Sequence, residues 1–423
     1  MKYLIYIFIF FGITISFGQN NLEDQYEAIE EKVIEWRRDF HQNPELSNRE
    51  FKTAEKIAKH LKSLGLEVQT GVAHTGVVAL LKGKQSGMVI ALRADIDALP
   101  VTERNNLAFK SEVKTTFLNT ETGVMHACGH DTHIAILMGV AEILSNNKDK
   151  INGTVKFIFQ PAEEGPPPGE EGGAKLMIKE GVLENPKVDA IFGLHINSQT
   201  PVGTIKYKTQ GIMAAVERFT IHVKGKQTHG SQPWSGVDPI LISAKIIDGL
   251  QTIISREAKL IEEAAVITVG KITSGTRFNI IPESAEMIGT LRTLNPEMKT
   301  LIVKRMHEMV ETIAKAYGGS ATITFENFTA ITYNNPELVN NMLPSLKKVA
   351  GEKNVTIMKA TTGGEDFSYF QEVIPGFYFF VGGMTPGAVE SFPHHTPDFT
   401  IDEDGLLLGV KALTQITFDF LNN

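Results

Sequence analysis

Apolar positions recur along the chain at two spacings, and the two patterns alternate. A stripe at helical spacing runs through Phe51, Ala54, Ile57 and Leu61, and short apolar runs at strand spacing follow it. These patterns predict helices over residues 22–40, 51–64, 132–145 and 174–180 and strands over 76–82, 88–93, 155–159 and 190–194. Because strands alternate with helices, we expect an α/β domain with a mainly parallel sheet that helices cover on both faces.

The start of the second predicted helix carries a polar motif. Ser47-Asn48-Arg49-Glu50 matches a capping box, in which the Ser and Glu side chains each accept a hydrogen bond from the other residue's backbone N–H. Gly65, directly after the apolar stripe, is expected to end this helix.

The order of the elements changes in the middle of the chain. The patterns there predict strands over 216–224, 265–271, 285–292 and 321–325 and helices over 239–254 and 296–317. The order β-α-β-β-α-β is that of a ferredoxin-like α+β domain. We therefore expect this domain, residues 209–327, to be inserted in a first domain made of residues 22–208 and 328–423. The last part should contain a helix over 337–349, a strand over 376–381 and a helix over 404–418.

Composition and charge narrow the classes of protein only a little. The chain has 423 residues, enough for two domains, and its 42% hydrophobic and 21% charged residues are an ordinary globular balance. The formal net charge of −8 argues against a nucleic-acid partner, which would favour a basic face.

The first residues are typical of a secretory signal. Lys2 precedes an uncharged apolar run, Tyr3 to Phe17, and Ser16-Phe17-Gly18 places small residues where a signal peptidase reads. The run is short for a membrane anchor. We expect residues 1–18 to be removed and the protein to be exported, periplasmic or secreted, with no stable membrane span. The single cysteine, Cys128, then cannot form an internal disulfide, so it is either inert or held by something such as a metal.

One stretch combines a thiol with imidazoles at the start of a predicted helix. Cys128 and His130 lie two residues apart within residues 126–133, HACGHDTH. A thiolate is favoured at a helix N-terminus, and a thiolate with an imidazole can bind first-row transition metals. By itself the pair is equally compatible with a buried cysteine beside capping polar residues.

Other polar residues follow the predicted strands where each strand ends. In chain order, these carboxylates and imidazoles are Asp95, Asp97, Glu163, Glu164, His195, His394 and His395. In open α/β sheets, ligands bind beyond the carboxyl ends of the strands. Each residue alone has an ordinary structural explanation, but their common place at one sheet edge predicts one convergent polar site.

The donor atoms in this site suit more than one metal ion. The candidate ligands are Cys128, His130, Glu164, His195 and one of His394 and His395. Such a set exceeds what one tetrahedral metal needs, and it suits two metals a few ångströms apart with a water between them. Glu163 can serve as the general base that takes a proton from this water and delivers it to a leaving amine. These residues together favour metal-assisted amide hydrolysis.

Five motifs, in this order along the chain, carry a family resemblance. They cover residues 93–100, 126–133, 160–164, 193–195 and 395–399. The chain resembles the metallopeptidase family of N-acyl-amino-acid amidohydrolases from about Val33 to its C-terminus. The most similar group includes hippurate hydrolase and the indoleacetyl-amino-acid hydrolases, with aminoacylase and carboxypeptidase G as relatives.

The resemblance implies roles for individual residues. It implies a di-metal catalytic domain interrupted by a smaller lid or dimerisation domain, with Glu163 as general base and Asp97 as a carboxylate that supports the site. Its His-x-Pro spacing selects His395 over His394. The implied metal ligands are Cys128, His130, Glu164, His195 and His395.

Two further residues are implied in the inserted domain. Residues 225–231 resemble the family's glycine-rich loop, in which His229 would stabilise the oxyanion, in some relatives from a neighbouring subunit. The loop carries Lys226-Gln227-Thr228 where relatives often have more glycine. Residues 278–282 resemble a segment that presents Asn279 to the substrate. A homodimer is expected only through the inserted domain, because its sheet edge could pair across subunits.

The sequence thus predicts an exported amidohydrolase that depends on two divalent ions, with manganese, zinc, cobalt and nickel all compatible. It would cleave N-acyl amino acids, such as N-acetyl or N-benzoyl derivatives, to a carboxylate and a free amino acid. One alternative is an exported carboxypeptidase or dipeptidase on short peptides, and a dipeptidase would need a partner for the free amine. Another is a catalytically silent binding relative, against which the retention of Glu163 and of every proposed ligand argues.

Overall fold

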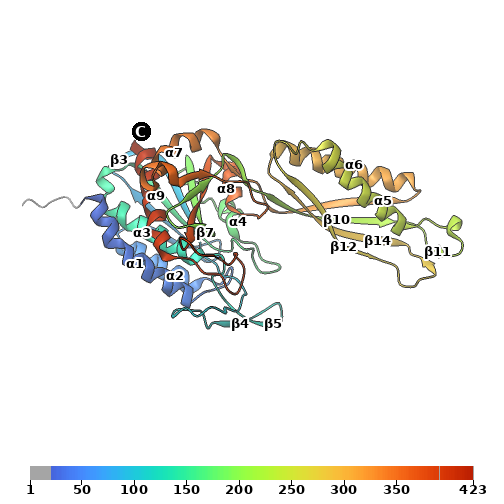
Figure 1. The fold of residues 1–423 in the computed structure, drawn as a ribbon, viewed down its shortest axis with the longest axis horizontal. Coiled ribbons are helices and arrows are strands. Elements are labelled where there is room, and N and C mark those ends of the chain that lie inside the picture. The colour runs from blue at the N-terminus through green and yellow to red at the C-terminus, as the bar shows by residue number, and fades with distance from the viewer. Residues whose placement is uncertain (1–20, 390, 423) are drawn as a thin grey trace, which may run out of the picture.

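The computed structural model describes residues 21–389 and 391–422, so the predicted signal segment, residues 1–18, lies outside the described residues. The described chain forms two parts that lie one after the other along the long axis of the molecule (Figure 1), and each part has its own sheet. Across the described residues, every helix is too short or too polar to cross a membrane.

The larger part is built on an eight-stranded mixed sheet with the strand order β1-β2-β6-β3-β7-β18-β8-β17. The four central strands, β6, β3, β7 and β18, are parallel to one another, whereas β1, β2 and β8 pair antiparallel with their inner neighbours. The strands are β1 (Glu67–Val72), β2 (Gly76–Lys82), β3 (Gln85–Asp95), β6 (Asn152–Gln160), β7 (Ala190–Pro201), β8 (Ile205–Tyr207), β17 (Val355–Ile357) and β18 (Gly376–Met384).

Helices cover both faces of this sheet, as the alternating pattern predicted. One face packs in the main hydrophobic core with α1 (Leu22–Gln42), α2 (Phe51–Ser63), α3 (His130–Asn146), α7 (Pro336–Ala350) and α9 (Leu406–Asn422). The other face packs on the shorter helices α4 (Gly173–Lys179) and α8 (Phe367–Val373). Helix α3 is buried on nearly all sides, because it lies between the sheet and α1.

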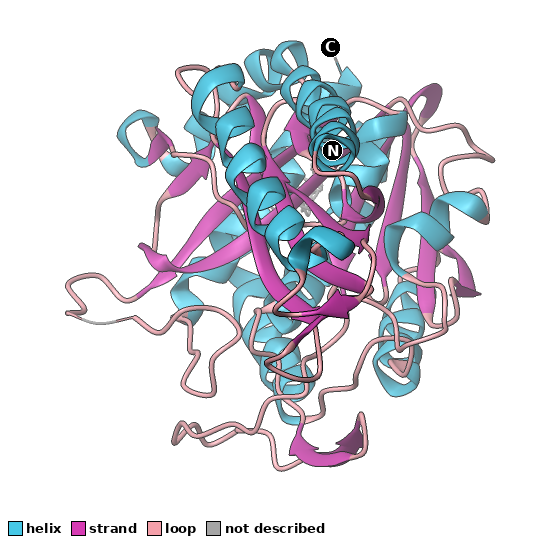
Figure 2. Cartoon of the chain, turned by 90° about the vertical axis from the view of Figure 1, so that its right-hand side faces the viewer, coloured by secondary structure: helices cyan, strands magenta, loops and turns pink. Residues whose placement is uncertain are grey.

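The smaller part has the β-α-β-β-α-β order of a ferredoxin-like domain. Its antiparallel sheet has the order β12-β14-β10-β15, and its alternating burial shows that one face packs on α5 and α6. Figure 2 shows this part facing the viewer. The elements are β10 (Ala215–Lys224), α5 (Pro239–Thr252), β12 (Ala265–Ser274), β14 (Ser284–Thr293), α6 (Pro296–Ala316) and β15 (Ser320–Thr329), and a short pair at the tip is β11 (Thr228–His229) with β13 (Ile280–Ile281).

The capping box predicted before α2 is wrong. Ser47 donates its hydroxyl to Oδ2 of Asp97 instead, at 2.7 Å. Glu50 is buried and accepts hydrogen bonds from the Thr75 hydroxyl and from the N–H of Ala162. The free N–H of Thr53 in the first turn is satisfied by Glu45, at 2.8 Å. The motif residues are used to join α2 to the loops around the sheet edge, which a local pattern does not reveal.

Several short strands of the structure were not predicted from the sequence. They include the hairpin of β4 (Lys114–Phe117) and β5 (Thr120–Gly123) and the pair of β9 (Gln210–Met213) with β16 (Thr332–Asn334), which lies where the chain passes between the two parts. Strands of three or four residues carry too little apolar periodicity to be read from the sequence.

Candidate metal centre

The polar residues that follow the central strands meet at one edge of the larger sheet. Strand β6 ends at Gln160, shortly before Glu163 and Glu164, and His195 lies within β7. Helix α3 begins at His130. The loop after β18 returns to this edge, where the N–H of His395 donates to the carbonyl oxygen of Ala127 at 2.8 Å.

Gly129 allows Cys128 and His130 to face the same site. Its φ is +94°, in the left-handed region that favours glycine, and it directly precedes α3. A Cβ at this position would lie 2.4 Å from Cγ2 of Ile196. The turn between the thiol and the imidazole therefore requires glycine.

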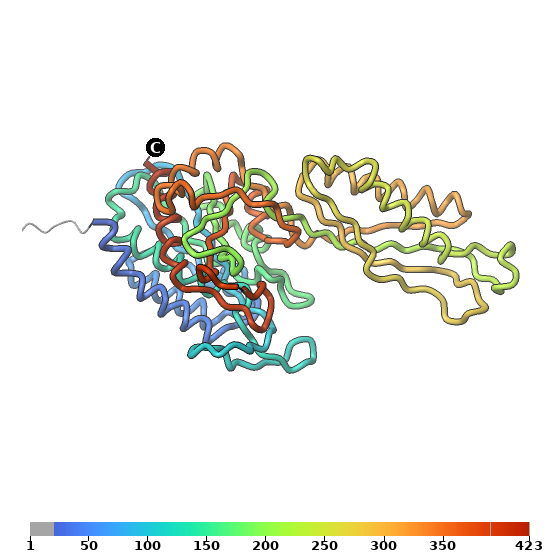
Figure 3. Tube along the Cα trace, viewed as in Figure 1, coloured from blue at the N-terminus to red at the C-terminus, as the bar shows by residue number. Residues whose placement is uncertain are grey.

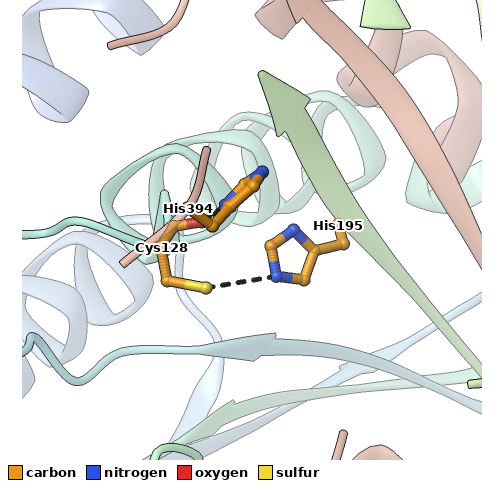
Figure 4. Close-up of side chains that lie close together, drawn as sticks. All are labelled: Cys128, His195 and His394. Carbon is orange, nitrogen blue, oxygen red and sulfur yellow. Dashed lines mark hydrogen bonds between the residues drawn. The ribbon is translucent and has the colours of Figure 1, made fainter. Parts of the chain in front are cut away.

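The structure brings the five predicted donor side chains together. Figure 4 shows Sγ of Cys128 facing Nε2 of His195, at 3.5 Å. Nε2 of His395 lies 3.2 Å from the same sulfur and 3.0 Å from Oε1 of Glu164. Cys128, His130 and Glu164 each offer one ligand atom, and these atoms lie within 4.8 Å of one another. Sulfur, nitrogen and oxygen donors thus converge from four separate segments.

The two neighbouring histidines differ in what their ring nitrogens contact. Nδ1 of His394 lies 3.0 Å from the carbonyl oxygen of Cys128, and Nε2 of His394 accepts from the N–H of Ser198 at 3.3 Å. His394 lies close enough to Cys128 and His195 to be grouped with them, but both of its nitrogens are bonded to backbone. Nε2 of His395 instead faces the sulfur and the carboxylate, so the geometry favours His395 as the donor.

Asp97 supports His130 through contacts with its ring nitrogen Nδ1. Nδ1 of His130 donates to the backbone oxygen of Asp97 at 2.9 Å and lies 3.2 Å from its Oδ1. Oδ2 of Asp97 accepts from the Ser47 hydroxyl and from the N–H of Glu164, at 3.0 Å. One carboxylate therefore orients two candidate ligands, which is how metal-binding histidines are usually supported.

The residues fit a bound cation. Nε2 of His130 is buried and makes no hydrogen bond with any residue that the structure describes, and the contact that Oε1 of Glu164 makes with Nε2 of His395 at 3.0 Å lacks hydrogen-bond geometry. Burial raises the pKa of the Cys128 thiol well above its usual range, and the carboxylates of Glu164 and Glu163 raise it further. Unpaired buried atoms and crowded negative groups are costly, and a divalent cation between these donors would pair the atoms and offset the charge.

Glu163 lies beside the donors and faces a second acidic cluster. Its Oε2 is 3.8 Å from Nε2 of His130, and its Oε1 accepts from the N–H of Asp366 at 3.4 Å. Burial raises the pKa of Glu163 well above its usual range, and Glu365 and Glu164 add to the shift. A carboxyl group with a raised pKa beside the donor cluster is suited to accept and release a proton.

Arg93 also belongs to the site, although no role was predicted for it. Its guanidinium is fully buried and contacts Asp95 at 2.6 Å and both Glu365 and Asp366 at 2.9 Å. It thereby balances the acidic cluster that faces Glu163. The only signal in the sequence was that Arg93 and Asp95 lie two residues apart on one strand and so share a face.

His133 is a second residue that the sequence analysis left without a role. Its Nδ1 lies 2.5 Å from Oδ1 of Asp95, and its Nε2 accepts from the N–H of Ile196 at 2.9 Å. His133 therefore ties α3 to the backbone beside His195. Its spacing from His130, three residues along a helix, could have indicated that both face one site.

His229 and Asn279 lie together but away from the donors. His229 is in β11, and the N–H of Gly230 donates to the backbone oxygen of Asn279 at 2.8 Å. Figure 1 shows β11 at the far end of the smaller part, whereas α3 and β7 lie in the larger part. Nδ1 of His229 accepts from the N–H of Ser231 at 3.1 Å. Within one chain in this conformation, neither side chain reaches the donor cluster.

Comparison with known proteins gives consistent matches over nearly the whole chain. The family model described as peptidase family M20/M25/M40 matches residues 91–419. Thermostable carboxypeptidase 2 of Saccharolobus solfataricus is 41% identical over 95% of this chain and 98% of its own length. The N-acetylcysteine deacetylase of Bacillus subtilis is 38% identical over 92% of this chain and 97% of its own.

Solved structures are similar in fold and in sequence. A crystal structure from Bacillus subtilis, described as a dinuclear metal-binding peptidase of the M20 family, has a TM-score of 0.77 and 36% identity. The match covers 94% of this chain and 99% of that one.

Proposed function

Because the chain belongs to peptidase family M20/M25/M40, and is thereby a metal-dependent hydrolase of amide bonds, we propose that it cleaves N-acyl amino acids to a carboxylate and a free amino acid. The observation that carries this proposal is the convergence of five donor side chains with Glu163 beside them. Support for the acyl substrate comes from the N-acetylcysteine deacetylase among the relatives.

Two divalent ions would be held by the donor cluster. The side chains are Cys128, His130, Glu164, His195 and His395, and the dinuclear metal-binding relative supports the number of ions. When bound, the ions would polarise the acyl carbonyl and make a water molecule easier to deprotonate. Mixed sulfur, nitrogen and oxygen donors suit manganese, zinc, cobalt and nickel.

Side chains of the protein would then carry out the proton transfers and keep the ligands in position. Glu163 would take the proton from the attacking water and later deliver it to the nitrogen of the leaving amine. Asp366 holds one oxygen of Glu163 through its backbone N–H, so the carboxylate is directed towards the donors. Asp97 would keep Nε2 of His130 and the backbone of Glu164 in place.

We also propose that His229, with Asn279, acts on the substrate from a second copy of the chain. Within one chain His229 lies at the far end of the inserted domain (Figure 1). Strand β12 is an edge of the smaller sheet and exposes Val266 and Ile272, so it offers an apolar edge for pairing between two copies. His229 would then reach the acyl oxygen as negative charge develops on it.

A carboxypeptidase is the second candidate function. The thermostable carboxypeptidase among the relatives, at 41% identity, favours it. The chemistry of the metal centre would be the same, because both reactions hydrolyse an amide bond next to a free carboxylate. The two functions differ in the group on the acyl side, which is a simple acid in one case and a peptide in the other.

The test is an assay of free amino acid released from N-acetyl, N-benzoyl and indoleacetyl amino acids and from short peptides, with manganese or zinc added. Release from N-acyl amino acids that is lost after chelation supports the proposal. Release from peptides alone supports the carboxypeptidase. Release from neither class by folded, metal-loaded protein contradicts both.

A further inference from the structure

A groove opens beside Glu164 at the edge of the larger part. Its volume is about 390 Å³, and Ser47, Glu164 and Gly165 are among the residues that line it. The hairpin β4–β5 forms one wall, and the loop after Glu164 forms another; Figure 3 shows these two segments next to each other. Because Ser47 is hydrogen-bonded to Asp97, the groove begins at the residues that hold the donor cluster.

The walls of the groove are largely apolar. The apolar side chains that line it include Leu99, Phe117, Leu118, Pro166, Pro167 and Pro168. Consecutive prolines have fixed φ angles, so this wall is stiff. An apolar, preformed groove that continues into a polar cluster is the usual form of a small-molecule site.

The charged side chains that line the groove provide no evident partner for an anionic occupant. Within the part of the chain that the structure describes, Arg49 is the only cationic side chain that lines it. Its guanidinium is already paired with both oxygens of Glu170. The other charge on the lining is the carboxylate of Glu164. Because Glu164 is a proposed metal ligand and Arg49 is paired with Glu170, the groove offers a substrate carboxylate no unpaired cationic side chain.

Leu118 is held in an unfavourable conformation at the tip of the hairpin. Leu118 and Asn119 form a two-residue turn with φ of +48° and +63°, a conformation that favours glycine, asparagine or aspartate. The Leu118 side chain is 65% exposed and lines the groove. A strained backbone that presents an apolar side chain to a groove is often part of a binding site.

From these observations we propose that the groove is the acyl subsite and that it takes a bulky, uncharged acyl group, an aromatic ring or a chain of several carbons. This inference rests on the proposed hydrolysis of N-acyl amino acids. The end of the groove at Glu164 lies beside the reacting amide, and the free carboxylate of the amino acid points elsewhere. A cavity of roughly 150 Å³ accommodates benzene, so 390 Å³ is far more than an acetyl group fills.

The experiment compares kcat/KM for N-acetyl-, N-hexanoyl- and N-benzoyl-alanine in metal-loaded protein. Leu118→Ala removes apolar contact area from the groove, and we expect the ratio of hexanoyl to acetyl kcat/KM to fall about tenfold. Thr116→Trp, on the same hairpin, fills the groove and should lower the same ratio. Both side chains are exposed in the free protein, so neither change should impair folding.

Ile357→Ala is the matched control, because Ile357 is 74% exposed on strand β17, at the opposite edge of the sheet from β1, and does not line the groove. In Ile357→Ala the ratio of hexanoyl to acetyl kcat/KM should stay within about twofold of the wild-type ratio. An unchanged ratio in both Leu118→Ala and Thr116→Trp would overturn the assignment.

Calorimetric binding of the same compounds to Glu163→Gln separates this inference from the proposed function. One outcome is that the hexanoyl compound binds more tightly than the acetyl compound, that Leu118→Ala weakens this binding, and that the wild type shows no turnover. This outcome would support the groove and contradict the hydrolase. Turnover that does not depend on the acyl group would support the hydrolase and contradict the groove. Neither binding nor turnover would contradict both.

Discussion

Nδ1 of His130 donates a hydrogen bond to the backbone oxygen of Asp97, and this contact determines which nitrogen of His130 is left for a ligand. The carbonyl oxygen can only accept, so the proton is on Nδ1. Nε2 then faces Glu164 and Glu163. The same Asp97 carboxylate accepts from the N–H of Glu164, so a single side chain supports two proposed ligands.

Removal of this support should weaken metal binding. We expect Asp97→Ala to lower metal affinity about 10- to 100-fold, because His130 and the N–H of Glu164 both lose their contact with the carboxylate, although the backbone oxygen of residue 97 still accepts from His130. Competition with a chromophoric chelator measures the affinity. Glu67→Ala, which removes an exposed carboxylate paired with Lys82, is the control and should bind metal as the wild type does. Equal affinity in Asp97→Ala would show that the Asp97 carboxylate has no role in support.

The thiol of Cys128 should be needed for metal occupancy. Its sulfur lies within 3.5 Å of His195 and 3.2 Å of His395, so it is placed between the two imidazoles. We expect Cys128→Ser to bind less metal per chain, because an alcohol is a far weaker ligand than a thiolate. Elemental analysis after gel filtration measures this directly. Full occupancy in the variant would remove Cys128 from the proposed ligand set.

Glu50 should make stability depend on pH. Burial raises the pKa of Glu50 to about 7 from 4.5, and Asp97 nearby adds to the shift. Because the folded protein holds this proton more tightly than the unfolded chain, the stabilisation is complete below pH 4.5 and is lost as the pH rises through 7. In Glu50→Gln this titration is absent. We expect the free energy of unfolding of the wild type, relative to the variant, to fall by on the order of 3 kcal/mol over that range.

Urea unfolding of both proteins at several pH values between these limits provides the measurement. Parallel curves of unfolding free energy against pH would contradict the assignment to Glu50.

If His229 acts across two subunits, two inactive variants should restore activity when mixed. Glu163→Gln retains His229, and His229→Ala retains Glu163, so a mixed dimer has one intact site. Random reassociation makes half of the dimers mixed, and about a quarter of the wild-type activity is then expected. Activity that stays at the level of the separate variants, although subunits exchange, would place His229 within its own chain or outside the reaction.

Much of the fold could be predicted because it depends on long apolar patterns. The stripe through Ala54, Ile57 and Leu61 in α2 is a strong local signal, although Phe51 at its start is exposed. In the smaller part, the alternation in β10 and similar patterns up to residue 325 gave the β-α-β-β-α-β order. The donor residues could be found because strand ends place them at one edge. The roles of Ser47 and Glu50 could not, because their partners, Asp97 and Thr75, are distant in the sequence.

The buried charges around the centre were harder to predict for the same reason. Arg93 is balanced by Glu365 and Asp366, more than 270 residues along the chain. The groove was also beyond a sequence pattern, because the prolines after Glu164 and the hairpin at Leu118 meet only in the folded chain.

The most direct test of the central claim compares wild type with Glu163→Gln for metal content and for release of alanine from N-acyl alanines. We predict that the variant keeps the metal content of the wild type and loses turnover by roughly 10²- to 10⁴-fold, because only the proton-transfer group has changed. A variant that retains turnover within a few-fold of the wild type, or that loses its metal, would contradict the role of Glu163.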